Sequence, residues 1–234
     1  MRSVLASLLL ALLVPSAARA ASAAEGLTAM EKRWLDGIWP VVGFAKHQGL
    51  PLDIVVQPQP APEAAPLSLG FVDGRCKLVL SMRENPEVQR TMEQIEPALL
   101  DASLELMAAH ELGHCRRYLD GAWHGLPAGF VIQEPIGLRP EQRQAYRAMR
   151  LTRREEGYAD LTGLAWTQRQ RPQQYARLHA WLLAERSRER LPGSHHDTLA
   201  WLQLAADPAL LAADGKDGAT IFETAASLWQ RVED

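Results

Sequence analysis

The stretch H-E-L-G-H, residues 110–114, lies inside a helix-favouring run over residues 104–118. On an α-helix, residues four positions apart lie one above the other on the same face. The imidazoles of His110 and His114 can therefore reach a single metal ion. Glu111 sits one step around the helix, close enough to contact a water molecule on that metal. The stretch predicts a helix that carries metal-binding side chains on one face, as in zinc hydrolases that use a Glu as general base.

The segments before this helix predict three strands. Residues 52–57, 67–72 and 76–81 have strand-like composition, and Asp73-Gly74 is a hairpin signal between the last two. The helix itself is expected over residues 97–119, because Gly121 can end it. We expect the last strand, residues 76–81, to form the sheet edge against which an extended peptide substrate aligns.

The rest of the chain predicts further helices. Thr28 and Glu31 have capping-box spacing, which predicts a helix start. After the central helix, residues 122–139 form a long loop rich in Gly and Pro, of the kind that serves as a lid or a wall. Helices are then expected over residues 140–170, 172–188, 197–206, 207–213 and 220–232. The fold class that follows is α+β, mainly helical, with a small β-sheet beside the active-site helix.

The first twenty residues read as a signal peptide. Arg2 is followed by an apolar stretch over residues 3–14 and by Ala18-Arg19-Ala20, an A-x-A cleavage pattern, with Ala21-Ser22-Ala23 as the alternative. The apolar stretch is short for a membrane span. We expect residues 1–20 (or 1–23) to be removed and residues 24–234 to form a single domain with a helical C-terminal half. The mature protein is then exported, to the periplasm or outside the cell, with no transmembrane anchor.

Composition narrows the class of partner. Hydrophobic residues make up 47% of the 234-residue chain, enough for a sizeable core, and the net charge is −3. This charge does not suggest a dedicated nucleic-acid binder. The two cysteines, Cys76 and Cys115, form a disulfide or remain two buried thiols, and export to an oxidising compartment favours the disulfide. The oligomeric state stays open.

A catalytic zinc ion needs a third protein ligand and one open position. Asp120 occupies the place of the last His in the pattern H-E-x-x-H-x-x-G-x-x-H. However, Arg117 stands where that pattern has the glycine that turns the chain back to the metal. With Arg117 there, the helix is expected to continue and to carry Asp120 away from the site.

A second acidic pair offers a better ligand. Glu156 and Asp160 are four residues apart within the predicted helix over residues 140–170, so they share one face. One carboxylate can bind zinc while the other accepts the N–H of a ligand histidine. Glu155 is the neighbouring competitor, but its spacing to Asp160 does not present the same face. The alternative to a metal site is a solvated acidic patch beside nearby arginines.

With these two motifs the chain resembles the gluzincin metallopeptidases, which pair H-E-x-x-H with a later E-x-x-x-D on a second helix. The long gap between the motifs is most similar to that of the prenyl-protease-like (CaaX-type) gluzincins. The resemblance implies a zincin-like fold, one Zn²⁺ per chain held by His110, His114 and Glu156, and contact of Asp160 with His110. It covers the two motifs and not the whole chain.

Gluzincins commonly bring a His or Tyr from a downstream segment to stabilise the transition state. The resemblance points first to His196, then to His195, with Tyr158 behind them. The family's downstream His-Pro segment is followed by an Arg, whereas here Asp197 follows His196 and that Arg has no obvious counterpart. The alternative for this segment is a helix cap with incidental histidines.

These observations predict an exported zinc-dependent endopeptidase that hydrolyses peptide bonds through a zinc-activated water, with Glu111 as general base. Its partner is a peptide or protein substrate. One alternative is a zinc hydrolase of a non-peptide substrate, since the same ligands polarise other carbonyls. The other is a non-enzymatic, metal-stabilised binding or assembly protein, against which the presence of Glu111 argues.

Overall fold

A computed structural model describes residues 26–57, 64–188, 193–212 and 220–232 of the chain. The predicted signal peptide lies outside these residues. Among the residues described, none of the helices is both long enough and apolar enough to cross a membrane.

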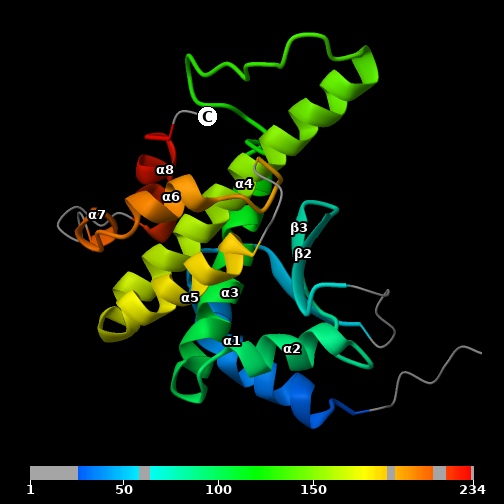
Figure 1. The fold of residues 1–234 in the computed structure, drawn as a ribbon. Coiled ribbons are helices and arrows are strands. Elements are labelled where there is room, and N and C mark those ends of the chain that lie inside the picture. Colours follow the sequence, from blue (N-terminus) through cyan, green and yellow to red (C-terminus); the bar gives the residue numbers. More distant parts are fainter. Residues whose placement is uncertain (1–25, 58–63, 189–192, 213–219, 233–234) are drawn as a thin grey trace, which may run out of the picture.

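The described residues form an α+β arrangement, mainly helical with one small sheet, as the sequence predicts (Figure 1). The helices are α1 (Ala29–His47), α2 (Pro86–Gln94), α3 (Leu100–Leu119), α4 (Pro140–Gln170), α5 (Tyr175–Ser187), α6 (Leu199–Leu204), α7 (Ala209–Ala212) and α8 (Ile221–Trp229). The strands are β1 (Leu52–Val56), β2 (Leu67–Val72) and β3 (Arg75–Leu80). Single 3₁₀ turns, Pro97–Leu99 and Pro172–Gln174, lead into α3 and α5. Figure 1 shows α3 and α4 at the centre, with the sheet on one side and α6, α7 and α8 on the other.

The local signals for α1 and for the β2–β3 hairpin are confirmed. Thr28 accepts a hydrogen bond from the backbone N–H of Glu31, whose side chain accepts one from the backbone N–H of Thr28 in return. Asp73 and Gly74 have φ angles of 53° and 72°, the left-handed conformation that a two-residue hairpin turn requires. The elements therefore begin and turn where short-range chemistry directs them.

The order of the strands corrects one expectation. The sheet has the order β1-β3-β2, in which β3 pairs in parallel with β1 and antiparallel with β2. The predicted edge strand, residues 76–81, is therefore the central strand, and β2 is the edge beside α3. The error arises because β1 crosses over to pair with the far side of β3, a long-range pairing that leaves no local signal.

A glycine inside the H-E-L-G-H stretch allows α3 and α4 to pack closely. A Cβ atom on Gly113 would lie 2.9 Å from the Cα of Ala159 on α4. A Cβ on Gly163 would lie 2.9 Å from the backbone oxygen of Leu106 on α3. Neither contact can be relieved by a side-chain rotation, because each involves the main chain. The two glycines therefore set the close approach that brings the histidines of α3 to the carboxylates of α4.

We expect Gly113→Ala to destabilise the protein by about 1–3 kcal/mol and to weaken metal binding, because an overpacked contact pushes the two helices apart. Thermal unfolding followed by circular dichroism, together with the zinc content of the purified variant, measures both effects. Gly43→Ala is the matched control, since a Cβ there meets nothing within 4 Å. A Gly113→Ala protein as stable and as zinc-loaded as the Gly43→Ala protein would contradict the packing argument.

A disulfide joins the sheet to the central helix. Cys76 on β3 and Cys115 on α3 are bonded, with their Cα atoms 5.7 Å apart. Both cysteines are fully buried. The bond ties the centre of the sheet to the residue directly after His114 and so restrains the helix turn that carries this histidine.

A buried arginine fastens the long loop and the last helix to α4. The guanidinium of Arg154 lies 4.0 Å from the ring centroid of Phe130 in the loop and 4.7 Å from that of Trp229 on α8. Its Nη1 also donates to the backbone oxygen of Val232 at 3.2 Å. Aromatic faces stabilise a cation in this way, most strongly where water is excluded. Arg154 therefore anchors elements that no local pattern would place together.

Candidate metal centre

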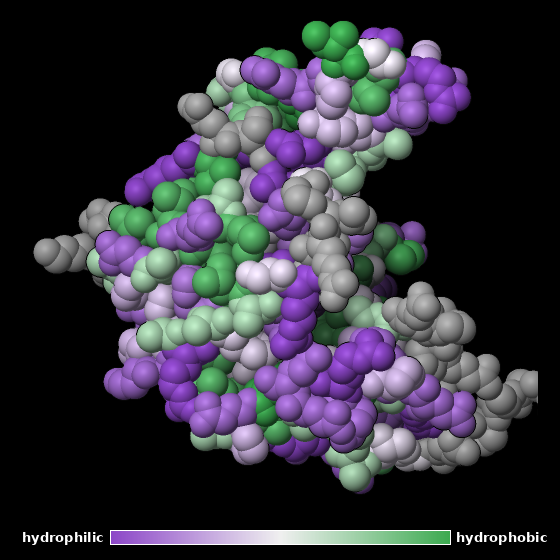
Figure 2. All heavy atoms as spheres, viewed as in Figure 1, coloured by the Kyte–Doolittle hydropathy of each residue, from purple (hydrophilic) through white to green (hydrophobic). Residues whose placement is uncertain are grey.

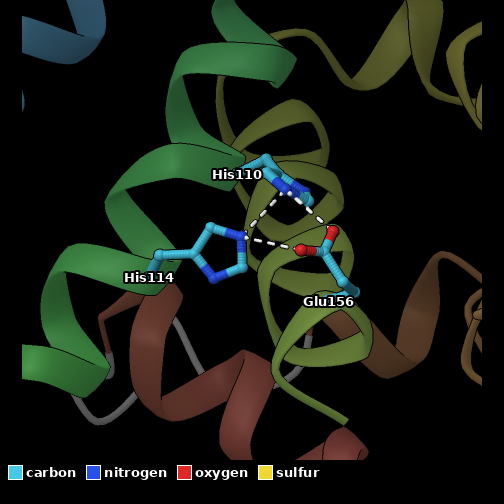
Figure 3. A group of neighbouring side chains, drawn as sticks. All are labelled: His110, His114 and Glu156. Carbon is cyan, nitrogen blue, oxygen red and sulfur yellow. Dashed lines mark hydrogen bonds and ion pairs between the residues drawn. The ribbon is translucent and has the colours of Figure 1, made fainter. Parts of the chain in front are cut away.

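His110 and His114 of α3 and Glu156 of α4 converge at one point (Figure 3). The two Nε2 atoms are 3.2 Å apart. Nε2 of His110 lies 3.5 Å from Oε2 of Glu156, and Nε2 of His114 lies 3.5 Å from Oε1 of the same carboxylate. The helical spacing places both imidazoles on one face of α3, and the close packing of α4 brings the carboxylate to them.

These three side chains are close enough together to hold one metal ion. Zinc–ligand distances of about 2.0–2.1 Å around a tetrahedral centre place neighbouring ligand atoms about 3.3–3.4 Å apart. The 3.2 Å between the two Nε2 atoms is close to that value, and the two 3.5 Å separations join these nitrogens to different oxygens of the Glu156 carboxylate. Two imidazole nitrogens and one carboxylate oxygen are also the donor types that zinc prefers, with the fourth position open. The described residues therefore form a possible metal-binding triad.

Asp160 lies directly behind this triad. Its Oδ1 is 2.9 Å from Nδ1 of His110. Burial by itself raises the pKa of this carboxyl, but Arg186 and His110 outweigh it and hold the pKa below its ordinary value. When the His110 ring is neutral, an ionised Asp160 that accepts its Nδ1–H leaves the Nε2 lone pair facing His114 and Glu156.

The partners of Asp160 include two residues that the sequence did not reveal. Arg186 on α5 donates to Oδ2 through Nε at 2.9 Å and to Oδ1 through Nη2 at 2.7 Å. The hydroxyl of Thr198 donates to Oδ2 at 2.6 Å. Arg186 also lies 3.6 Å from Oε2 of Glu156. No local pattern distinguishes Arg186 from the other basic residues around it, because its partner Asp160 lies 26 residues earlier in the chain.

Glu111 lines the same cavity as the triad. Burial raises the pKa of its carboxyl, an effect that the charges of His110 and His114 oppose. A carboxylate whose pKa lies closer to neutrality is a better proton acceptor at neutral pH than an exposed one. Glu111 therefore lies in the same cavity as the triad but is not one of its three converging side chains.

The rejected ligands lie elsewhere. Asp120 caps the end of α3, exposed and paired with Arg116 at 2.8 Å. The helix continues past Arg117, which binds both oxygens of the buried Glu155 at 2.9 and 2.8 Å. Glu155 also accepts the backbone N–H of His124 at 2.8 Å. Arg117 and Glu155 therefore hold the start of the long loop, and neither belongs to the metal-binding triad.

The three residues predicted to stabilise the transition state, His196, His195 and Tyr158, lie in different surroundings. His196 lines the cavity, whereas His195 is exposed and is not among the lining residues. Tyr158 is buried, and its hydroxyl donates to the backbone oxygen of Phe222 at 3.2 Å, away from the cavity. Burial and the nearby Arg186 lower the pKa of His196, so that its imidazole is neutral at neutral pH. Of the three, His196 alone is placed to meet a ligand in the cavity.

The cavity around the cluster has a volume of about 530 Å³. One wall is formed by residues 65–69, which lead into β2 and include its first residues, and another by Trp123 from the long loop. The Trp123 ring packs edge-on against His114 at 5.6 Å and stacks on Tyr118 at 4.1 Å between centroids. Trp123 belongs to the long loop, residues 122–139, that the sequence predicts to serve as a lid or a wall. At this residue the loop forms a wall of the cavity.

The charge of His110 predicts how metal binding depends on pH. Burial disfavours its imidazolium form, but Asp160 and Glu156 outweigh burial and raise the pKa of His110 to about 10 in the metal-free protein. A metal ion needs the neutral ring, so binding displaces this proton at neutral pH. We expect zinc affinity to rise with pH, by about tenfold per unit below this pKa.

Calorimetry in buffers of different ionisation enthalpy measures the number of protons released. The expected value is about one proton per zinc ion at neutral pH. Binding without proton release, with an affinity independent of pH between 6 and 8, would show that His110 is already neutral.

No family model, curated protein or solved structure gives a significant match to this chain. The function must therefore be inferred from the side chains themselves: a triad suited to a metal ion, the half-buried carboxylate of Glu111 in the same cavity, and the neutral imidazole of His196.

Proposed function

We propose that this chain is a zinc-dependent endopeptidase of the gluzincin type with a zincin-like fold. The observation that carries the proposal is the convergence of His110, His114 and Glu156 beside Glu111, with Asp160 bound to His110. A site that only stored a metal ion would not need the half-buried carboxylate of Glu111 in the same cavity. The signal-peptide pattern of residues 1–20 supports export of the enzyme to the periplasm or the cell exterior.

Zinc is the metal that this donor set favours, at one ion per chain. His110, His114 and Glu156 would hold it and leave one position open for water or substrate. When bound there, zinc would supply Lewis-acid polarisation of the scissile carbonyl and would lower the pKa of a water molecule.

Three protein side chains have distinct roles in the proposed reaction. Glu111 takes a proton from the attacking water and delivers it to the leaving amine. His196 donates a hydrogen bond to the carbonyl oxygen as negative charge develops there, a role for which a neutral imidazole N–H is suited. Asp160, held by Arg186 and Thr198, keeps the His110 ring in the tautomer that a ligand requires.

The substrate lies extended along β2. This strand is an edge of the described sheet, and residues 65–69 line the cavity. An unpaired strand edge binds an extended peptide through main-chain hydrogen bonds, which suits hydrolysis within a chain. The cavity favours this reading over a non-peptide substrate, since a small ester needs no strand beside it.

The first test asks whether the purified mature protein binds zinc and cleaves peptide bonds. We expect one zinc ion per chain by elemental analysis, cleavage of casein or a peptide library, and loss of cleavage with a chelator that zinc then restores. Bound zinc with hydrolysis of esters alone would favour the non-peptide hydrolase. Bound zinc with no hydrolysis would favour the binding or assembly protein.

A further inference from the structure

One end of the cavity is apolar. Leu106 and Met107 precede His110 by one turn of α3, about 5 Å along the helix axis. Trp181 and Leu182 precede Arg186 by about one turn of α5, and Trp34 of α1 also lines the cavity. We call these five residues the apolar end. Trp34, Leu106 and Leu182 are buried and form its floor, whereas Met107 and Trp181 are half-buried.

The direction of the helices places these residues together. Gln174, just before α5, donates to the backbone oxygen of Ala98, just before α3. Since α5 later reaches Asp160 and His110 through Arg186, it runs in the same direction as α3. The residues one turn before Arg186 and one turn before His110 therefore lie at the same end of the cavity. The ion pair of Arg33 with Asp101, 2.6 Å, brings the neighbouring Trp34 to that end as well.

The charged groups of the cavity lie away from this end. None of the charged or histidine residues that line the described cavity precedes His110 on α3 or Glu185 on α5; they are His110, Glu111, His114, Glu156, Asp160, Glu185, Arg186 and His196. The indole nitrogen of Trp181 is buried, so ring carbon is what this side chain presents to the cavity. Figure 2 shows hydrophobic surface in a hollow between α5 and α2, with hydrophilic residues around it.

We propose that the apolar end binds a large apolar side chain of the substrate, such as Leu, Met or Phe, at a residue next to the scissile bond. This inference rests on the proposed peptidase function. An extended peptide advances about 3.3 Å per residue, so a side chain beside the hydrolysed bond reaches a pocket one helix turn from His110. Burying an apolar side chain there is favourable, whereas a carboxylate or ammonium group would lose its hydration without a partner.

The test maps every cleavage in a randomised peptide library by mass spectrometry. We expect one position flanking the scissile bond to favour Leu, Met or Phe over Gly and Asp by about 10–200-fold, the range of an apolar pocket. Met107→Glu should then lower kcat/KM for the best peptide by about tenfold or more. Val131→Glu, the matched control, introduces the same charge at an exposed residue outside the cavity lining and should leave kcat/KM unchanged. Zinc content and thermal unfolding establish that both variants are folded and loaded.

Peptide affinity gives a second test. It requires neither catalysis nor a substitution in the apolar end. Calorimetry with the Glu111→Gln protein compares the best peptide with the same peptide carrying Gly at the selected position. We expect the Gly peptide to bind about tenfold more weakly or worse. Three results would overturn this inference and leave the proposed peptidase function intact. They are hydrolysis that depends on Glu111 but shows no residue preference, equal binding of the two peptides, and an unchanged preference in folded Met107→Glu. If the parent protein cleaves no peptide, the result would instead contradict the proposed peptidase function on which this inference rests.

Discussion

Glu111→Gln is expected to abolish peptide cleavage while leaving zinc in place. Gln has nearly the same shape as Glu but cannot accept the proton of the attacking water. General-base catalysis contributes on the order of 10²–10⁴-fold to a rate, so kcat should fall by that factor. The three side chains of the triad do not include Glu111, so the metal ligands remain in the variant. KM should change little, because the substrate contacts remain.

Initial rates on a cleaved peptide, with zinc content measured on the same preparation, separate the two effects. Glu185→Gln is a matched control, since Glu185 lines the same cavity and also carries a carboxylate. It should retain activity of the same order as the parent. Cleavage that survives Glu111→Gln undiminished would exclude the proposed mechanism.

Glu156→Ala is expected to remove zinc and with it all activity. The change takes away one of three converging ligands and leaves His110 and His114 alone. Loss of a group that only orients a ligand weakens metal binding by about 10–100-fold. Loss of the ligand itself should exceed that range, so that the purified variant contains almost no zinc.

Asp120→Ala distinguishes this site from the one rejected on sequence. Asp120 is exposed and pairs with Arg116, and it caps the helix without approaching the triad. The variant should hold as much zinc as the parent protein. Zinc retained by Glu156→Ala but lost from Asp120→Ala would move the metal site to the end of α3.

Much of the fold was predictable because its signals are local. The capping box at Thr28, the hairpin turn at Asp73-Gly74 and the helix start at Pro140 each depend on a few neighbouring residues. The meeting of the acidic pair with the two histidines was also within reach, because two i,i+4 motifs of matching chemistry restrict how their helices can meet. The choice of Glu156 as the ligand followed from the resemblance to the gluzincins. Such features depend on periodicity and turn chemistry, which a sequence displays directly.

The identity of the edge strand and the contact of Arg186 with Asp160 could not be predicted from local sequence patterns. The expected edge strand, residues 76–81, is the centre of the sheet because β1 pairs with its far side. Arg186 binds Asp160 across 26 residues of sequence, and nothing adjacent to it marks the contact. Both are pairings between distant segments, which depend on how the elements pack.

By itself, the sequence determined the helical face with its two histidines and Glu111, a second acidic pair at the same spacing, and the elements that carry them. Only the tertiary structure decided that Glu156 converges with the histidines while Asp160 lies behind His110, that His196 lines the cavity and His195 does not, and that Arg186 and Thr198 hold Asp160. The reason is physical: helix periodicity sets which side chains share a face, whereas close packing at Gly113 and Gly163 sets which faces meet.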